Sequence, residues 1–372
     1  MSDFRSDNTC PPAPAVLARL QHALAAGGSA YAEDEITSAT RASLSQIFEH
    51  EVDFFPIFTG TAANALAIAQ LSDRFGEVIC HRNSHIFLDE CGAVEFHSQV
   101  RLRPIEGRHG KILPESLPPL MDSGDPHRGK PAILSLSQCT ETGLVYRPDE
   151  IAYLAGKAKL AGLRVHMDGT RFANAVAFTG ASPAELTWRA GVDVLCLGAT
   201  KGGAIGAEAV IFFCPDDARE FRRMMKRAGH LGARMWFLSA QIQAWLDGEY
   251  WLRAAGHSNT MAAMLDQALR ASGIQPHYPV EGNMVFVEMS SDQSQMLADK
   301  GFLHYFMEQP DGHLVARLVT SHDTQPAEIK ALARAIEECL AASFTTAGKQ
   351  TGRVGSEALA NVPCRERPKS RL

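Results

Sequence analysis

Short apolar runs and helical patterns alternate between residues 52 and 215, and this alternation restricts the fold more than any other feature of the chain. Each run has the length of a buried strand, and the stretches between the runs carry apolar residues at helical spacing. The predicted strands cover residues 52–58, 131–136, 163–167, 192–197 and 209–213, and the predicted helices cover 61–71, 148–160 and 183–190. This order is typical of an α/β fold with a mostly parallel sheet and helices on both faces.

The pattern changes after about residue 250. A helical stretch at 252–272 leads to predicted strands at 283–289 and 314–320, and then to a predicted helix at 326–342. We therefore expect a large domain over residues 1–250, including an N-terminal arm, and a smaller α+β domain over residues 251–344. Residues 345–372 are mostly small, polar or basic, so they are expected to form a disordered tail.

Composition and charge exclude several classes of protein. The 372 residues carry a formal net charge of −6 without a basic excess in the body of the chain, which argues against nucleic-acid binding. We find neither a secretory signal nor an apolar run long enough to span a bilayer. Eight scattered cysteines without a C-x-x-C pair favour free thiols in a reducing compartment. The sequence therefore predicts a cytoplasmic protein that binds neither nucleic acid nor membranes.

Two charged side chains follow neighbouring predicted strands. Lys201 comes after the run at 192–197, and Asp168 follows the run at 163–167. Sheets of this type bind ligands at the carboxyl ends of their strands, so both side chains are expected in one site. An amine can form a Schiff base with pyridoxal phosphate (PLP), and a carboxylate can keep the ring nitrogen of PLP protonated. The pair predicts a PLP site in which burial lowers the pKa of Lys201. A surface lysine in a glycine loop is the alternative.

A phosphate-binding site is predicted at residues 58–64, which follow the first strand and begin a helix. Gly60 permits a close backbone approach, Thr59 and Thr61 offer hydroxyl groups, and the helix start offers free N–H groups. An ordinary helix cap is the alternative. Thr200 provides a further hydroxyl next to Lys201, and the glycines that follow Lys201 would leave room for the cofactor.

The histidines at 81 and 85 raise the question of a metal site. The flanking residues 78–80 resemble a strand, so the helix that would align His81, His85 and Glu90 as ligands is missing, and we expect no metal ion. His85 can instead stack on a planar cofactor. A structural, hydrogen-bonded histidine is the alternative.

Two arginines are candidate anion-binding residues. Arg171 follows Asp168 on a loop, where its guanidinium can bind a carboxylate or the phenolic oxygen of the cofactor. A salt bridge between Arg171 and Asp168 is the alternative. Arg317 lies in an otherwise apolar strand, where an unpaired charge is costly. Either a substrate carboxylate or a structural ion pair would satisfy it.

The joint order of these residues resembles that of the low-specificity L-threonine aldolases, which are fold-type-I PLP enzymes of the aromatic amino acid β-eliminating lyase/threonine aldolase group. The resemblance runs from residue 6 to about 340. The motifs that support it lie at 6–8 (SDN), 31–34 (YAED), 58–64 (FTGTAAN), 85–93 (HIFLDECGA), 166–174 (HMDGTRFAN), 198–203 (GATKGG) and 317–320 (RLVT). Thr170 departs from the family pattern, where alanine is more usual, and the basic tail is not part of that pattern.

The resemblance implies an aminotransferase-like large domain and assigns the cofactor-binding residues. Lys201 would bind PLP covalently, and Asp168 would hold the pyridine nitrogen. His85 would stack on the ring, and Gly60 and Thr61 would bind the phosphate.

The resemblance also assigns residues around the substrate. Ser6, Arg171 and Arg317 would bind the substrate carboxylate, and Gln138 would line the cofactor pocket. Because the family forms dimers and tetramers, we expect a homodimer or homotetramer whose sites are shared between subunits. Three residues would reach the site of a neighbouring subunit: Tyr31, Arg227 and Arg234.

The implied reaction is a reversible retro-aldol cleavage of L-threonine, L-allo-threonine and related β-hydroxy-α-amino acids to glycine and an aldehyde. We assign to His85, acting directly or through water, the removal of the β-hydroxyl proton. The alternative is another fold-type-I PLP lyase or a transaldolase acting on β-hydroxy or β-substituted amino acids. The sequence leaves the threo or allo preference and any cation requirement open.

Overall fold

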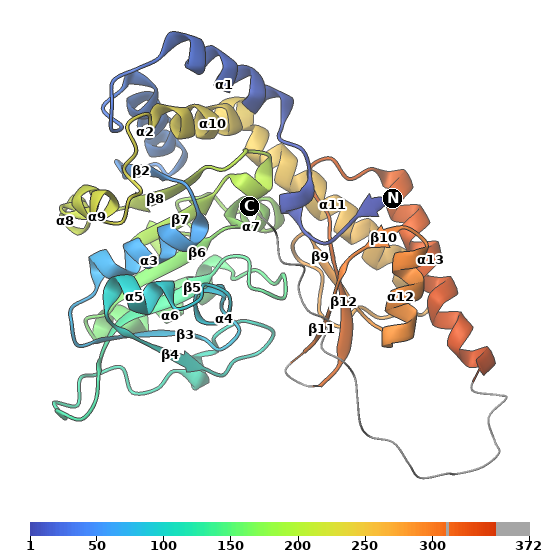
Figure 1. The fold of residues 1–372 in the computed structure, drawn as a ribbon. Helices are drawn as coiled ribbons and strands as arrows, with labels where there is room; N and C mark the ends of the chain where they lie inside the picture. Colours follow the sequence, from blue (N-terminus) through green and yellow to red (C-terminus); the bar gives the residue numbers. More distant parts are fainter. Residues whose placement is uncertain (310–311, 347–372) are drawn as a thin grey trace, which may run out of the picture.

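The computed structural model describes residues 1–309 and 312–346. A larger part is built around one seven-stranded sheet, and a smaller part contains the C-terminal elements (Figure 1). The predicted disordered tail falls outside the described residues, except for residues 345 and 346, which belong to the last helix. No helix among the described residues has both the length and the apolar character needed to cross a membrane.

The central sheet is mostly parallel, so the α/β prediction is confirmed. Its strands lie in the order β2 (Asp53–Ile57), β8 (Glu208–Phe212), β7 (Val194–Gly198), β6 (Arg164–Gly169), β5 (Lys130–Ser137), β3 (Gly76–His81) and β4 (Arg101–Ile105). Only β8 runs antiparallel to its neighbours in this sheet, and the other pairs are parallel. Every residue of β7 is buried, because a strand covered on both faces has no solvent side.

Helices flank this sheet (Figure 1). They are α1 (Pro14–Ala26), α2 (Glu35–Ile47), α3 (Gly60–Leu71), α4 (His85–Leu88), α5 (Ala93–Ser98), α6 (Pro148–Leu160), α7 (Phe172–Thr179), α8 (Pro215–Ala218), α9 (Phe221–Arg227) and α10 (Trp236–Leu246). The predicted helices at 61–71 and 148–160 are confirmed by α3 and α6.

The helix predicted at 183–190 was wrong. These residues form turns that end in the short 3₁₀ helix Trp188–Ala190. Ala184 and Leu186 are buried while Glu185 between them is exposed. Burial at a spacing of two does not match a helix face, so the apolar residues that suggested a helix are buried by a turn instead.

The smaller part begins with the long helix α11 (Tyr250–Ala271) and contains a three-stranded antiparallel sheet in the order β11 (Tyr305–Glu308), β12 (Leu314–Val319) and β9 (Met284–Glu288). The helices α12 (Ser291–Asp299) and α13 (Pro326–Thr346) complete it (Figure 1). These elements confirm the predicted strands at 283–289 and 314–320 and the predicted helix at 326–342. Their buried apolar side chains form a core separate from that of the large sheet.

The N-terminal arm crosses to the smaller part. Strand β1 (Ser2–Asp3) pairs in parallel with β10 (Phe302–Leu303), and Phe4 is buried in the smaller core. The backbone N–H of Val319 donates to the carbonyl oxygen of Phe4 at 2.8 Å. The arm therefore brings the residues that follow Phe4 to the junction of the two parts.

Candidate active site

A cleft of about 900 Å³ lies at this junction. Residues of the N-terminal arm, of the loops that follow the large-sheet strands, and of the smaller sheet line it together. The lining residues that carry functional groups include Ser6, His85, Glu141, Arg171, Lys201 and Arg317. The cleft thus brings together five residues that the sequence singled out, and it adds Glu141.

Asp168 lies at the carboxyl end of β6 and is buried. One carboxylate oxygen accepts from the N–H and the hydroxyl of Thr170, at 3.1 and 2.7 Å, and the other accepts from the Asn64 amide at 3.1 Å. Burial opposes ionisation, but the hydrogen bonds from Thr170 and the charge of His85 outweigh it, so the pKa of Asp168 is lowered. The result is a buried anion with a fixed orientation.

Asn64 links Asp168 to the histidine of the cleft. Its side-chain nitrogen donates both to Asp168 and, at 2.9 Å, to Glu90. Glu90 in turn pairs with Nδ1 of His85 at 2.9 Å. The hydrogen bond with Glu90 raises the pKa of His85, while burial raises the pKa of Glu90. The proton on Nδ1 of His85 is therefore held by Glu90, and the ring is fixed at the edge of the cleft.

Lys201 lies just beyond the end of β7, in the 3₁₀ turn Thr200–Gly202. Burial lowers the pKa of its ammonium group, and the nearby charge of Arg171 lowers it further. A larger fraction of neutral amine makes Lys201 a better nucleophile toward a carbonyl carbon. The alternative of a surface lysine does not fit this burial.

The glycines after Lys201 have a different role from the one expected. A Cβ at Gly202 would lie 2.4 Å from Nε1 of Trp245, and Gly203 has a φ of +109°. Both positions therefore require glycine for packing and backbone conformation. Only Gly206 faces open space. Trp245, and not a cofactor, occupies the room that Gly202 provides.

The start of α3 offers an open anion-binding position. Thr59 caps this helix by accepting from the N–H of Ala62 at 3.2 Å. The nearest atom to a Cβ built on Gly60 is the Thr170 hydroxyl, at an ordinary contact distance of 3.8 Å. The first N–H groups of α3, Gly60 and the Thr61 hydroxyl thus lie together at a helix start, a kind of position that can bind phosphate.

The loop that carries Lys201 is closed by its own hydrogen bonds. The hydroxyl of Thr200 accepts from the N–H of Ala207 at 3.1 Å, and Glu208 accepts from the N–H of Ala199 at 3.1 Å. Burial raises the pKa of Glu208 to about 7. Thr200 therefore helps to fix the turn around Lys201, and its contact with a phosphate remains a prediction.

Arg171 is paired with Asp7 and not with Asp168. Its Nε and Nη2 donate to the two Asp7 oxygens at 2.8 and 2.9 Å, and Asn283 donates to Asp7 at 3.0 Å. Burial opposes the charge on Asp7, but the positive charge of Arg171 lowers its pKa overall. Asp7 was not among the predicted site residues, although it lies within the family-like motif SDN at 6–8.

Arg317 differs from Arg171 because no carboxylate of the described residues pairs with it. Within residues 1–309 and 312–346 it forms no ion pair; its guanidinium lies 5.8 Å from the centre of the Tyr305 ring and 3.7 Å from the sulfur of Met284. Burial, and then the charge of Arg171, lower its pKa. The alternative of a structural ion pair is therefore not found in the described residues. An anionic ligand is the partner that the position of Arg317 favours.

Glu141 is a cleft residue that no sequence pattern singled out. It lies on the loop after β5, and burial raises its pKa. The positive charges of His85, Arg171 and Lys201 act in the opposite direction. The cleft therefore holds two groups with raised pKa values, His85 and Glu141, that are candidates for proton transfer.

Comparison with known proteins places this arrangement in a family. The family described as "Beta-eliminating lyase" matches residues 3–292. A low specificity L-threonine aldolase of Pseudomonas aeruginosa is 40% identical over 336 residues, which are 90% of this chain and 96% of that protein. The chain belongs to the β-eliminating lyase and threonine aldolase family.

Two further family members resemble the chain over nearly its full length. A low specificity L-threonine aldolase of Pseudomonas sp. (strain NCIMB 10558) is 39% identical over 345 residues, 91% of this chain and 98% of that protein. The solved structure of Leishmania major threonine aldolase superposes with a TM-score of 0.83 at 25% identity, covering 92% of this chain and 99% of that one. The fold-type-I assignment agrees with this superposition.

Gln138, which the family resemblance placed in the cofactor pocket, is buried beside Asp168. Its N–H donates to the carbonyl oxygen of Asp168 at 2.7 Å, and its side-chain amide exchanges two hydrogen bonds with the backbone of Tyr146, at 2.8 and 2.9 Å. Gln138 therefore braces the strand end that carries Asp168. Its contact with a cofactor remains a prediction.

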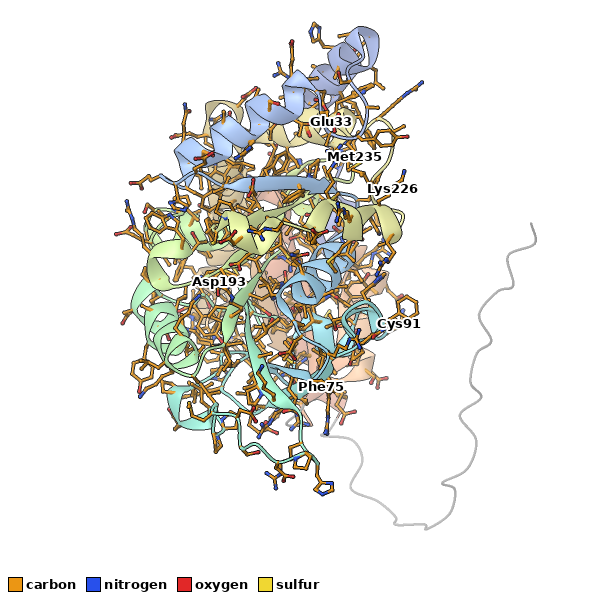
Figure 2. All side chains as sticks on the ribbon, turned by 90° about the vertical axis from the view of Figure 1, so that its left-hand side faces the viewer. Glu33, Phe75, Cys91, Asp193, Lys226 and Met235 are labelled. Atoms are coloured by element: carbon orange, nitrogen blue, oxygen red, sulfur yellow. The ribbon has the colours of Figure 1, made fainter. Side chains whose placement is uncertain are left out.

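The three residues that the family resemblance assigns to a neighbouring site lie away from the cleft of their own chain: Tyr31, Arg227 and Arg234. All three are exposed. The ring of Tyr31 lies 4.8 Å from Nζ of Lys226, on the side of the molecule where Figure 2 labels Lys226 and Glu33. Their position leaves them accessible to a second copy of the chain.

Proposed function

We propose that this family member is a PLP-dependent aldehyde-lyase that cleaves L-threonine, L-allo-threonine and related β-hydroxy-α-amino acids to glycine and an aldehyde, and that also catalyses the reverse reaction. One observation carries this proposal. The cleft holds a lysine of lowered pKa and an arginine that has no carboxylate partner among the described residues, beside the buried anion Asp168. The related Pseudomonas enzymes bear this activity in their names.

The residues of the site fit PLP. Lys201 would hold the cofactor through its side-chain nitrogen, Asp168 would hold the pyridine nitrogen, and the start of α3 would hold the phosphate. Buried atoms of the same network, Oδ1 of Asn64 and Oε2 of Glu90, have no hydrogen-bond partner among the described residues, as expected beside a polar ligand. When bound, PLP supplies a protonated ring that accepts the electron pair of the Cα–Cβ bond.

The arginines orient the substrate. Arg317 would bind the α-carboxylate, and Ser6 and Arg171 would lie at the same end of the cleft. Because Asp7 already neutralises Arg171, Arg317 supplies most of the attraction for the carboxylate. Fixing the carboxylate sets which bond to Cα stands perpendicular to the ring, and this selects the bond that breaks.

His85 would take the proton of the β-hydroxyl group, directly or through a water molecule. Glu90 holds Nδ1, so Nε2 remains to accept that proton. Replacement His85→Asn should lower kcat by about 10² or more without loss of PLP. Unchanged cleavage of threonine by this variant would exclude His85 as the base. Glu141→Gln would then be the next variant to test.

The assembly and the compartment are also proposals. A homodimer or homotetramer would bring exposed Tyr31, Arg227 and Arg234 of one copy to the cleft of another. The seven cysteines in the described residues are free thiols, which supports a reducing, cytoplasmic environment. Light scattering of the purified protein would measure the assembly, and a monomer with full activity would contradict shared sites.

A product assay tests the proposed reaction. L-threonine, L-allo-threonine and phenylserine would each be incubated with PLP-loaded protein, and glycine and the matching aldehyde would be quantified. We expect the two products in equal amounts. Pyruvate and ammonia formed without glycine would instead show that the protein catalyses β-elimination.

A further inference from the structure

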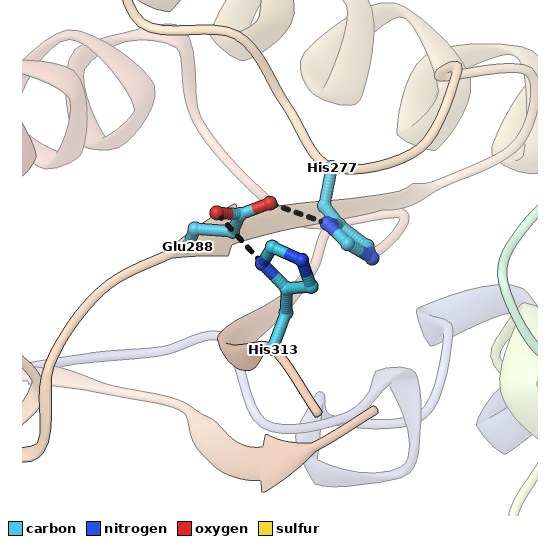
Figure 3. A group of neighbouring side chains, drawn as sticks. All are labelled: His277, Glu288 and His313. Atoms are coloured by element: carbon cyan, nitrogen blue, oxygen red, sulfur yellow. Dashed lines mark hydrogen bonds and ion pairs between the residues drawn. The ribbon is translucent and has the colours of Figure 1, made fainter. Parts of the chain in front are cut away.

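A second cluster of functional side chains lies in the smaller part, outside the residues that line the cleft. Two imidazole rings face one carboxylate there (Figure 3). Nδ1 of His277 lies 2.7 Å from one oxygen of Glu288, and Nδ1 of His313 lies 3.1 Å from the other. The three candidate ligand atoms all lie within 4.8 Å of one another.

The backbone holds these three residues together. Glu288 ends β9 and is paired in register with Val315 of β12, so His313 precedes the strand that lies beside Glu288. The N–H of His277 donates to the carbonyl oxygen of Phe286 at 2.8 Å, which ties the segment after α11 to the same strand. Strand pairing and this hydrogen bond therefore bring the side chains of three separate segments to one position.

We propose that His277, Glu288 and His313 bind one divalent transition-metal ion, for which Zn²⁺ is the best match. Two imidazole nitrogens and one carboxylate oxygen are a common zinc ligand set, with water in the fourth position. Ligand atoms about 2.0–2.2 Å from a tetrahedral zinc ion lie about 3.4 Å from one another. The two Nδ1–oxygen distances, 2.7 and 3.1 Å, are shorter than this value, and the three ligand atoms lie within 4.8 Å of one another, so small side-chain rotations are enough to admit the ion.

The chemistry of binding is a simple exchange. Each neutral imidazole moves its ring proton to Nε2 and offers Nδ1 to the metal, and Glu288 supplies one negative charge. No sequence pattern predicted this site, because the three residues lie in separate segments of the chain and become neighbours only through strand pairing.

The position suggests what the ion would do. His313 precedes β12, which carries Arg317, and β12 pairs with β11, which contributes Tyr305 and Met307 to the cleft. On the other side, the hydroxyl of Tyr278, next to His277, donates to Gln309 at 2.7 Å. A metal ion here would clamp the β11–β12 hairpin that forms one wall of the cleft. It would stabilise that wall without contacting the substrate.

Zinc binding by the PLP-loaded protein tests this proposal. Protein treated with a chelator and then dialysed would be titrated with Zn²⁺ against a coloured zinc indicator. We expect one equivalent bound per chain. Variants His313→Ala and Glu288→Gln should bind at least about 10- to 100-fold more weakly, since even the loss of an outer partner of a metal ligand has such an effect. His22→Ala, which removes an exposed imidazole on α1, is the matched control and should bind like the wild type.

Thermal unfolding provides a second readout, independent of activity. Zn²⁺ should raise the Tm of the wild type and of His22→Ala, and it should leave the Tm of His313→Ala unchanged. His313 is preferred to His277 for this test because the ring of His277 packs on Tyr278, with ring centres 4.4 Å apart. The proposal is overturned if the wild type takes up no zinc, or if His313→Ala and Glu288→Gln bind it like the wild type.

Discussion

The charged side chains on the two walls of the cleft differ in whether groups of the described residues already bind them. On the large-sheet side, Asp168 accepts three hydrogen bonds and Arg171 forms a bidentate pair with Asp7. On the hairpin side, Arg317 has no ion pair within the described residues. Charges that are already matched keep a rigid geometry, whereas an unmatched cation gains most from an anionic ligand. We infer that the large-sheet wall holds the cofactor and the hairpin wall holds the substrate carboxylate.

The largest effect is expected from Asp168→Asn, which removes the buried charge and keeps the shape of the side chain. The variant should lose on the order of 10³ in kcat, because the positive charge on the cofactor ring is no longer stabilised. It should still bind PLP through Lys201. Steady-state cleavage of threonine and the absorbance of bound PLP measure the two quantities. Full activity would remove Asp168 from the mechanism.

On the large-sheet wall, the ion pair between Asp7 and Arg171 is removed most directly by Asp7→Asn. Loss of the carboxylate leaves the buried Arg171 uncompensated, so the free energy of unfolding should fall by about 3 kcal/mol. Asp3→Asn on the same arm removes only the partner of exposed Arg5 and should change stability by less than about 1 kcal/mol. Denaturant unfolding of both variants measures the contrast. Equal stabilities would contradict the assigned role of the Asp7–Arg171 pair.

This pair also predicts a direction for the pH dependence of stability. The pKa of Asp7 is lower in the folded protein than its ordinary value of about 3.9. The contribution of Asp7 is therefore fully present above that ordinary value and is lost as the pH falls through the lower, folded value. The free energy of unfolding of Asp7→Asn should therefore fall less steeply than that of the wild type as the pH decreases below this ordinary value.

On the hairpin wall, Arg317→Ala tests whether Arg317 binds the substrate carboxylate. Loss of a charge-assisted contact of about 1.5–3 kcal/mol should raise the KM for threonine by about 10- to 100-fold, with little change in the affinity for PLP. Arg317→Lys keeps the charge but loses the planar fork, so its KM should lie between those of wild type and Arg317→Ala. A KM that is unaffected by Arg317→Ala would show that another residue binds the carboxylate.

The smallest effect is expected from Glu90→Gln, which should change the pH dependence of kcat/KM. A base acts only after it has lost its proton, so kcat/KM should rise with pH as His85 deprotonates. The hydrogen bond with Glu90 raises the pKa of His85, so this rise lies above the ordinary imidazole value of about 6.5. Glu90→Gln should move it to lower pH, whereas His81→Asn should leave it in place. An identical profile in Glu90→Gln would contradict the link between Glu90 and His85.

The sequence predicted the parts of the site that depend on local pattern. Strands β6 and β7 appear as continuous apolar runs because they are buried on both faces, and Asp168 and Lys201 follow them directly. Strand β4 was not predicted, since it is a short edge strand whose sequence, RLRPI, mixes arginine and proline with only two aliphatic residues.

The connections of the site could not be predicted, because they join distant residues. Asp7 and Arg171 are separated by 164 residues, and Asn64 and Asp168 by 104. The periodic pattern of apolar residues along a segment carries no information about a contact with a distant residue. Asn64 and Glu90 both lie in or beside motifs that resemble the family, yet only folding shows that Asn64 donates to both carboxylates.

The covalent attachment of PLP to Lys201 is the central claim, and trapping that bond tests it most directly. Protein incubated with PLP would be reduced with sodium borohydride, digested, and analysed by mass spectrometry. We expect the mass of a reduced pyridoxyl phosphate group on the peptide that contains Lys201, and neither this mass nor the absorption band of bound PLP in Lys201→Ala. Modification of another lysine, or no modification of a protein that cleaves threonine, would contradict the account.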